Sequence, residues 1–308
     1  TGRDTGGLAS QVLGLEIVLA DGSVVECSAD SDPELFHAAR VGLGAFGVVT
    51  ALTFAVQPAF LLHAREEPMP LDEVLERLPE LRAGNDHFEF FWFPHTNNTN
   101  TKRNNITDGP ARPLTPFKAW LDDDFLSNTV FERVNRVCRR FPGTVPMINR
   151  ISSRALSART YTDVSHKVFA SVRNVRFVEM EYAIPVEHVA DVLREVQEIV
   201  DRRGHRVSFP LEVRFTPADD VWLSTAYGRE SAYVAVHIYQ GTPYQTYFAD
   251  LEAVFTSVGG RPHWGKLHTS DRDYLESVHP RLKEALAVRD RVDPHRRFGN
   301  AYLDRIWD

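Results

Sequence analysis

The chain is poor in the residues that build disulfide frameworks and metal sites. Its 308 residues include only two cysteines, Cys27 and Cys138, and these lie far apart in the sequence. Two distant cysteines predict neither a disulfide scaffold nor a cysteine-ligated metal. They fit a reducing compartment, so we expect a cytoplasmic protein without a metal site.

Long apolar runs and basic runs are also missing. No stretch of about 18 apolar residues predicts a transmembrane helix, and the first residues show no signal-peptide pattern. The net charge of −7 and the absence of a basic run exclude a typical nucleic-acid partner. With 43% hydrophobic and 25% charged residues, and no repeat of fixed period, the sequence predicts one large or two ordinary globular domains.

Local patterns predict a mixture of strands and helices. Expected strands cover residues 12–19, 24–27, 48–56, 87–93, 175–184, 209–215 and 233–239. Expected helices cover residues 33–40, 71–81, 125–140, 189–204 and 247–258. Residues 97–108, which hold two glycosylation sequons, are expected to form a polar loop. This order favours an α+β fold, with an antiparallel sheet covered by helices on one face.

Three turn and cap signals support these boundaries. Asp21-Gly22 favours a tight hairpin turn, because such turns need positive φ angles. Asp32 is a plausible N-cap for the helix that begins at Pro33. The glycines at 42, 44 and 47 fit either backbone close to a cofactor or an ordinary helix-to-strand turn, and spacing does not decide between these readings.

Charged residues in otherwise apolar strands are the first functional signal. Glu212 and Arg214 share one face of a strand, while Leu211, Val213 and Phe215 take the other. A charged pair of this kind is often a structural salt bridge, although it can also line a ligand site.

Two further features accompany this pair. His237 stands in the apolar strand Tyr233-Val-Ala-Val-His-Ile-Tyr239, where a lone histidine is more often a satisfied core residue. The segment Pro262-His-Trp-Gly-Lys266 adds a lysine after an aromatic residue and a glycine, which allows close backbone approach. The coincidence of all three favours a functional site.

In this order, Glu212-x-Arg214, Val236-His237 and His263-Trp-Gly-Lys266 resemble the substrate domain of the aldonolactone and alditol oxidases, flavoproteins of the vanillyl-alcohol-oxidase type. Both ends of the chain agree with the resemblance. Residues 1–10 resemble the tail of the family's flavin loop, and residues 42–50 resemble its second flavin-contacting turn. Asp293-Pro294 with Arg297-Phe-Gly-Asn300 is similar to its closing segment. Residues 95 to 175 or so match only loosely.

The resemblance implies a two-domain flavoprotein of the PCMH type that binds FAD. Residues 1–57 would form the second FAD subdomain, residues 58–262 the substrate domain, and residues 263–308 a segment returning to the FAD domain. The implied cofactor-binding residues are Gly6, Gly7, Leu8, Ala9, Val49 and Asn300. The family's preceding FAD subdomain would lie upstream of Thr1 or on a separate partner chain, together with any covalent attachment site.

The resemblance also implies roles for four catalytic candidates. Lys266 would stabilise negative charge on the substrate oxygen, and His237 would accept the hydroxyl proton. Glu212 and Arg214 would bind a row of hydroxyl groups. Tyr239 would add a hydrogen bond, and His263 and Trp264 would form a wall of the site.

The activity implied is FAD-dependent oxidation of a sugar-derived lactone, of the D-arabinono-1,4-lactone or L-gulono-1,4-lactone type. Two alternatives remain open at the level of sequence. One is an alditol oxidase acting on open-chain polyols such as xylitol or sorbitol, which would use the same residues. The other is a non-catalytic binding chain that has lost its flavin subdomain.

Overall fold

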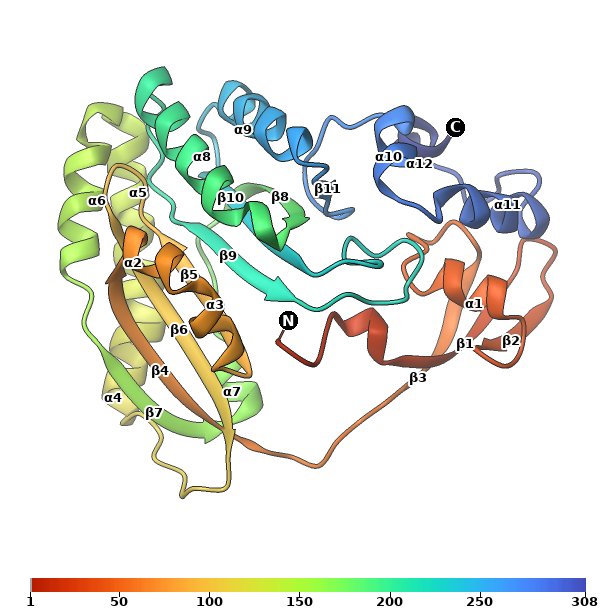
Figure 1. Ribbon diagram of the computed structural model, residues 1–308, viewed down its shortest axis with the longest axis horizontal. Helices are drawn as coiled ribbons and strands as arrows, with labels where there is room; N and C mark the ends of the chain where they lie inside the picture. Colours follow the sequence, from red (N-terminus) through yellow and green to blue (C-terminus); the bar gives the residue numbers. More distant parts are fainter. Residues whose placement is uncertain (1) are drawn as a thin grey trace.

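Two antiparallel sheets organise the computed structural model, which describes residues 2–308 (Figure 1). The small sheet has the order β2-β1-β3, and the large sheet has the order β11-β8-β10-β9-β5-β6-β4-β7. The small sheet consists of β1 (Val12–Val18), β2 (Val24–Ser28) and β3 (Val48–Phe54). The strands of the large sheet, in sheet order, are β11 (Arg261–Pro262), β8 (Phe177–Pro185), β10 (Ser231–Tyr239), β9 (Leu211–Thr216), β5 (His87–Trp92), β6 (Asn98–Thr107), β4 (Leu61–Pro70) and β7 (Arg159–Val164).

One face of the large sheet is apolar and is covered by four helices. Alternate residues of the strands, such as Phe90, Val213 and Val236, are fully buried in one hydrophobic core. The helices contribute Leu and Val at helical spacing, for example Val192 and Val196, because one stripe of each helix faces the sheet. These helices are α2 (Leu71–Glu76), α3 (Leu78–Ala83), α8 (Val189–Arg203) and α9 (Gln245–Ser257).

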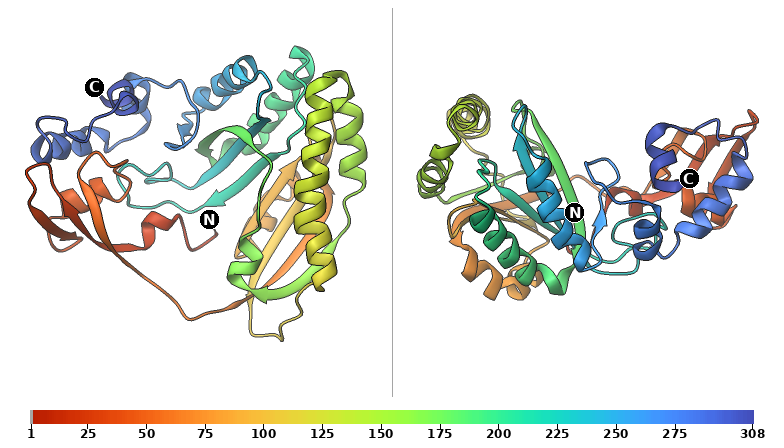
Figure 2. Two further views of the ribbon diagram at one scale, coloured as in Figure 1. Left: turned by 180° about the vertical axis from the view of Figure 1, so that it is seen from behind. Right: turned by 90° about the horizontal axis from the view of Figure 1, so that it is seen from above.

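The other face of the large sheet is polar and only partly covered. A helical region between β6 and β7 lies on this side, opposite α8 and α2 when the molecule is viewed from above (Figure 2). It contains a π-helical segment, η2, which is a rare form in which each bond spans five residues. The region consists of α4 (Pro116–Ala119), η2 (Trp120–Val130), α5 (Phe131–Arg140), η3 (Pro142–Thr144) and α6 (Val145–Arg154). Two short elements, α7 (Ser165–Phe169) and η4 (Val186–His188), and the strand-linking loops complete this lobe.

The chain's first and last segments form the second lobe together (Figure 2). Ile17 and Phe36 from the start share a core with Leu275, Leu303 and Trp307 from the end. The core thus joins regions that are distant in sequence. The elements are η1 (Leu8–Gln11), the small sheet, α1 (Pro33–Ala39), α10 (Arg272–Val278), α11 (Leu282–Val292) and α12 (Ala301–Trp307).

Several expected boundaries are confirmed. Asp32 caps α1, its carboxylate accepting a hydrogen bond from the Leu35 N–H at 3.3 Å. Gly204 ends α8 in the left-handed conformation, with a φ of 69°. Gly47 also has a positive φ, and an added Cβ would lie 2.5 Å from Ile17 of β1. Close packing of the turn on β1 therefore requires glycine at this position.

The expected loop at residues 97–108 is wrong, because this segment forms β6, an interior strand of the large sheet. It pairs with β4 on one side and β5 on the other. Thr99 and Thr101 are fully buried, and their hydroxyls donate to the carbonyls of Met69 and Glu67. Its polar side chains are satisfied by backbone and charged neighbours, which the polarity of the sequence alone does not reveal.

Two smaller expectations also need correction. Residues 71–81 form α2 and α3 rather than one helix, with a break at Arg77 before Pro79. The turn between β1 and β2 is longer than a two-residue turn, and of its Asp21-Gly22 pair only Gly22 has a positive φ.

Cys27 and Cys138 are both buried free thiols. In residues 2–308, no helix has the length and apolarity needed to cross a bilayer.

Asn149 provides a stability test of the packing of α6. Its buried amide donates to the carbonyl of Pro94 at 3.0 Å and to that of Val207 at 2.8 Å. Asn149→Ala leaves two buried carbonyls without these donors, so we expect a loss of about 2–3 kcal/mol in the free energy of unfolding. Urea denaturation measures the loss. Ile151→Ala on the same helix is the control, because Ile151 is 60% exposed and its change should stay within about 0.5 kcal/mol. Equal effects would contradict this account of α6.

Candidate functional site

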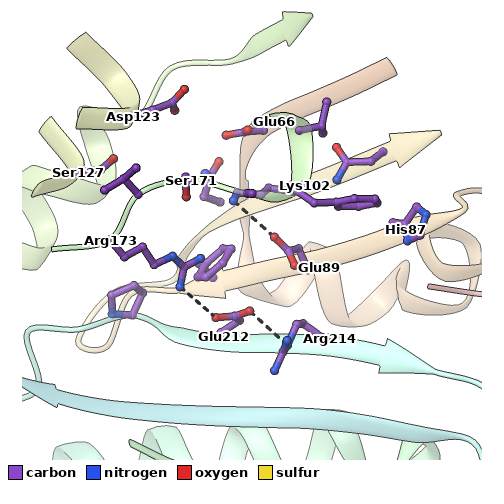
Figure 3. A pocket seen from close by; sticks show the side chains of 18 of the residues that line it. Glu66, His87, Glu89, Lys102, Asp123, Ser127, Ser171, Arg173, Glu212 and Arg214 are labelled. Atoms are coloured by element: carbon purple, nitrogen blue, oxygen red, sulfur yellow. Dashed lines mark ion pairs between the residues drawn. The ribbon is translucent and has the colours of Figure 1, made fainter. Parts of the chain in front are cut away.

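A large cavity lies over the polar face of the large sheet. Its volume is about 1470 Å³, and its lining runs from the turn at Gly6–Leu8 to Lys266. The strands supply Glu89, Lys102, Glu179, Glu212, Arg214 and His237, while the η2 region and residues 167–175 supply the opposite wall. Figure 3 shows how side chains from both sides face this space. Three of the four predicted catalytic residues therefore reach one cavity from neighbouring strands, and Lys266 reaches it from a turn.

That turn places Lys266 at the edge of the sheet. Residues 263–266 follow β11, and the N–H of Lys266 donates to the carbonyl of His263 at 3.0 Å. The next N–H, of Leu267, donates to the carbonyl of Glu179 on β8 at 3.0 Å. The turn is thus fixed to the backbone of β8, so the Lys266 ammonium lies directly over the Glu179 carboxylate and donates to it.

Glu179 joins Lys266 to His237. Its Oε1 lies 3.4 Å from Nε2 of His237, and its Oε2 accepts the hydrogen bond from Lys266. Burial would raise the pKa of Glu179, but the hydrogen bonds from His237 and Lys266 outweigh it and lower the pKa to about 2. Glu179 is therefore a carboxylate throughout the neutral range.

His237 is fixed by backbone and aromatic neighbours. Its Nδ1 lies 3.3 Å from the carbonyl oxygen of Pro210. Both ring nitrogens therefore face groups that only accept, the Pro210 carbonyl at Nδ1 and the Glu179 carboxylate at Nε2, so a neutral ring can donate to only one of them. The edge of Phe177 contacts the ring at a centroid distance of 5.0 Å. A neutral ring thus leaves one nitrogen with its lone pair toward an acceptor, whereas a protonated ring donates to both Pro210 and Glu179.

Glu212 and Arg214 form part of a second ion-pair group. Nε of Arg214 lies 3.2 Å from Oε1 of Glu212, and Nη2 of Arg214 donates to Glu181 on β8. Burial raises the pKa of Glu212, while the charge of Arg214 opposes that rise. Arg173, from the opposite wall, lies 4.0 Å from Glu212 and is drawn toward it in Figure 3. Glu212 thus faces the cavity between two cations.

Further charges continue across the same face of the sheet. Lys102 lies 3.4 Å from Glu89 and 4.9 Å from the ring centre of Phe91. On the next strands, Arg159 pairs with Glu66 at 2.8 Å and with Asp123 of η2 at 2.9 Å. The ion pairs of Arg159 thus fasten η2, in the opposite wall of the cavity, to β4 and β7.

The expected cofactor residues are divided. Gly6, Gly7 and Leu8 line the cavity, and Thr1, at the start of the loop-like motif, lies outside the described residues. Ala9 is not part of the cavity lining, and Val49 is 42% exposed on β3. Asn300 caps α12, because its side-chain Oδ1 accepts hydrogen bonds from the N–H groups of Tyr302 and Leu303.

The expected wall residues are placed differently from the prediction. Trp264 lies in the core of the second lobe, where its indole N–H donates to the carbonyl of Leu223 at 2.7 Å. His263 accepts a hydrogen bond from the N–H of Gly265 at 3.1 Å and does not contribute to the cavity lining. Tyr239 donates to Glu132 at 2.6 Å, away from this cavity. Gly265 has no positive φ, and an added Cβ would meet His263 at 3.5 Å, an ordinary contact. The site therefore uses Lys266 from this motif, not its neighbours.

Sequence reasoning missed Glu179 and Glu181. The signal was present, because Phe177-Val-Glu-Met-Glu-Tyr182 alternates charged and apolar residues in the same way as the Glu212-x-Arg214 strand. Register then brings Glu179 directly opposite His237. No group of three or more potential metal ligands gathers among residues 2–308.

Comparison with known proteins identifies the family. A sequence profile described as D-arabinono-1,4-lactone oxidase matches residues 52–306. The chain belongs to this family. The profile thus covers Glu212, His237 and Lys266, the residues on which the resemblance was recognised, and that recognition is confirmed.

Curated relatives carry related names. An L-gulono-1,4-lactone dehydrogenase of Mycobacterium tuberculosis is 40% identical over 97% of this chain and 69% of its own length. The L-gulonolactone oxidase of Bos taurus is 32% identical over 100% of this chain and 71% of its own. An alditol oxidase of a Streptomyces species is more distant, at 26% identity over 100% of this chain and 70% of its own.

Solved structures support the fold of this D-arabinono-1,4-lactone oxidase family member. A cholesterol oxidase variant from Brevibacterium sterolicum aligns with a TM-score of 0.80 at 17% identity, covering 98% of this chain and 70% of that one. Identity at this level establishes similarity of fold alone. The expected α+β fold with an antiparallel sheet and flanking helices is confirmed.

The depressed pKa of Glu179 predicts a specific loss of stability in acid. Its pKa falls from 4.5 to about 2 on folding, so its contribution is complete above pH 4.5 and is lost as the pH falls toward 2. The contribution of Glu179 to the free energy of unfolding is at most about 3 kcal/mol, and about 2 kcal/mol of it should be lost at pH 3. Glu179→Gln removes this titration. We therefore expect urea unfolding to show a gap between wild type and Glu179→Gln that is wide at pH 6 and about 2 kcal/mol narrower at pH 3. An unchanged gap would refute the ion-pair account.

Proposed function

We propose that this protein is an FAD-dependent oxidoreductase that oxidises a CH–OH group of a sugar-derived lactone, of the D-arabinono-1,4-lactone or L-gulono-1,4-lactone type. One observation carries the proposal. Lys266, His237, Glu212 and Arg214 face a single cavity, from a turn and two strands that the large sheet holds in register. Membership of the family supports the choice of substrate class.

The cavity can accommodate a flavin beside a small substrate. The turn at Gly6–Leu8 lies at one end of a cavity of about 1470 Å³, and the charged cluster lies at another. Backbone N–H groups of Gly6, Gly7 and Leu8, which line the cavity, would hold the cofactor, and Ala9, Val49 and Asn300 are further proposed contacts outside this lining. When bound, FAD would supply the hydride acceptor, the N5 atom of its flavin ring, for the hydride that leaves the substrate carbon.

We assign domains in accord with this arrangement. Residues 1–57 and 263–308 would belong to the FAD domain, and residues 58–262 would form the substrate domain. The shared core of the chain's first and last segments supports this division.

Two buried free thiols are compatible with a reducing location, for which we propose the cytoplasm.

Lys266 is proposed to stabilise the substrate oxygen. Its side chain lines the cavity and is 28% exposed, and the turn fixes the position of its positive charge. As the hydroxyl proton leaves toward His237, the substrate oxygen gains negative character, and a fixed cation then interacts with it more strongly than it did in the ground state. Lys266 thereby lowers the barrier of the chemical step.

His237 is proposed to take the hydroxyl proton at Nε2. In the tautomer that donates from Nδ1 to the Pro210 carbonyl, Nε2 holds the available lone pair. An imidazole can be neutral near pH 7, which allows it to act as a base. Its side chain is 7% exposed, so few water molecules compete for this nitrogen.

Glu212 and Arg214 are proposed to position the substrate. Arg214 donates from a planar fork, while Glu212 accepts, so the pair can bind neighbouring hydroxyl groups of one sugar. The pair is already matched in charge, with Nε and Oε1 3.2 Å apart. A neutral polyhydroxyl ligand therefore suits it better than a charged one would. This favours a lactone or polyol over a sugar acid.

An alditol oxidase is the second candidate. The chain is 26% identical to a protein named alditol oxidase over its whole length. An open-chain polyol presents a similar row of hydroxyls to Glu212 and Arg214. Comparison of lactones with xylitol and sorbitol as reductants of the bound flavin distinguishes the two. A purified protein without flavin absorption would instead favour a non-catalytic binding chain.

Lys266→Met tests the catalytic proposal directly. Methionine keeps most of the apolar stem and removes the charge. We expect the rate of anaerobic flavin reduction by a lactone, followed by stopped-flow absorbance, to fall on the order of 10²-fold, with little change in substrate binding. Lys283→Met is the matched control, since Lys283 is 78% exposed and far from the cavity lining. An unaltered reduction rate in Lys266→Met would remove Lys266 from the chemistry.

Arg214→Ala tests the positioning role. The variant loses charge-assisted hydrogen bonds to a buried ligand, so kcat/KM should fall by roughly 2–4 kcal/mol while the fold is kept. Steady-state kinetics and thermal unfolding should be measured together. Arg194→Ala, at a side chain 60% exposed on α8, should change neither. Collapse of thermal stability with normal turnover of the folded fraction would instead identify a structural salt bridge.

A further inference from the structure

The carboxylate of Glu179 contacts both proposed catalytic groups, His237 and Lys266. Oε1 of Glu179 lies 3.4 Å from Nε2 of His237, and Oε2 accepts the hydrogen bond of Lys266. The two oxygens of a single carboxylate thus face the proton acceptor and the cation. The Glu179 side chain is only 13% exposed, so water screens these contacts weakly.

We infer that Glu179 is a positioning residue that couples His237 to Lys266, so that the two act as one unit. The inference deepens the proposed function and rests on it. Glu179 does not react with the substrate. It fixes the direction of the Lys266 ammonium and stabilises the positive charge that forms on His237 when Nε2 takes the proton.

The charge balance explains the coupling. Before proton transfer, a neutral His237 that donates from Nδ1 to Pro210 presents the lone pair of Nε2 toward the Glu179 carboxylate, which is an unfavourable contact. After transfer, an N–H⁺ faces the same carboxylate, which is favourable. The proton passes from the substrate hydroxyl to Nε2, and no further reactant is needed. Glu179 therefore stabilises the state after transfer more than the state before it.

Neighbouring charges do not replace Glu179. Glu181, two residues further along β8, pairs with Arg214 instead. Glu212 pairs with Arg214 and faces Arg173. Within residues 2–308, the ion pairs of Lys266 and His237 are formed with Glu179 alone. Removal of this carboxylate thus separates the two groups.

The strand order fixes the geometry of the coupling. Register places Glu179 opposite His237 across β8 and β10. The backbone of Glu179 also accepts the N–H of Leu267, next to Lys266. Main chain and side chain of one residue therefore hold the lysine turn, and this double attachment favours a fixed position over a flexible surface contact.

A double-mutant cycle in the flavin-loaded protein is the test. Glu179→Gln in the wild-type background should lower kcat on the order of 10- to 100-fold, with KM changed less than about threefold. In the Lys266→Met background the same change should cost only a few-fold, because one partner is already absent. Glu179→Asp should recover part of the loss, since it restores the charge.

Controls separate coupling from folding and from substrate binding. Glu73→Gln removes a carboxylate of α2 that pairs with Arg77 outside the cavity lining, so kcat should stay within about twofold. Glu181→Gln acts through Arg214 and should raise KM rather than lower kcat. Additive losses in the cycle, or a full loss of stability in Glu179→Gln with normal kcat in the folded fraction, would overturn the inference.

A chemical readout tests the contact without turnover. Limited acetylation followed by mass spectrometry compares Lys266 with the exposed Lys283. The freed amine of Lys266 should react about threefold or more faster in Glu179→Gln than in wild type, relative to Lys283. If no lactone or polyol reduces the wild-type flavin while this change is seen, the proposed function fails and the anchoring by Glu179 stands. Unchanged labelling would refute the anchoring itself.

Discussion

The large sheet depends on pairing charge with charge across one of its faces. A row of paired residues with alternating charge crosses five neighbouring strands. In order from β7 to β9, it consists of Arg159, Glu66, Lys102, Glu89 and Arg214. Opposite charges on adjacent strands stabilise each other, whereas like charges would repel. The other face is dry and packed with apolar side chains. Because each strand serves both faces, the core fixes the register, and the register fixes the order of charges that line the cavity.

The same constraint turns the end of this row into a reactive site. Beyond Arg214 the row is no longer a simple pair, because Glu181 and Glu212 both contact this arginine. On the outer strands, Glu179 holds a histidine and a lysine. An excess of partly buried charge at one edge is expensive for folding alone, and such clusters are typical of functional sites. The position of the lysine turn on β8 completes the cluster.

Much of this could be read from the sequence because the informative residues break a local pattern. Glu212 and His237 stand out among apolar neighbours, and the Asp32 cap and the Gly204 helix end have local causes. The position of Lys266 over Glu179 could not be read, since it depends on contacts between segments about 87 residues apart. The strand β6 was missed for a related reason. Its polar side chains look like a loop until the partners on β4 and β5 are known.

The most direct test of this account is a crystal structure of the flavin-loaded protein with an unreactive lactone analogue. We expect the analogue's hydroxyls to contact Glu212 and Arg214, and the oxygen that corresponds to the reacting hydroxyl to lie within hydrogen-bonding distance of Lys266 and His237, about 3 Å. Glu179 should keep its contacts with both residues. An analogue bound elsewhere in the cavity, with the flavin ring distant from Lys266, would contradict the account.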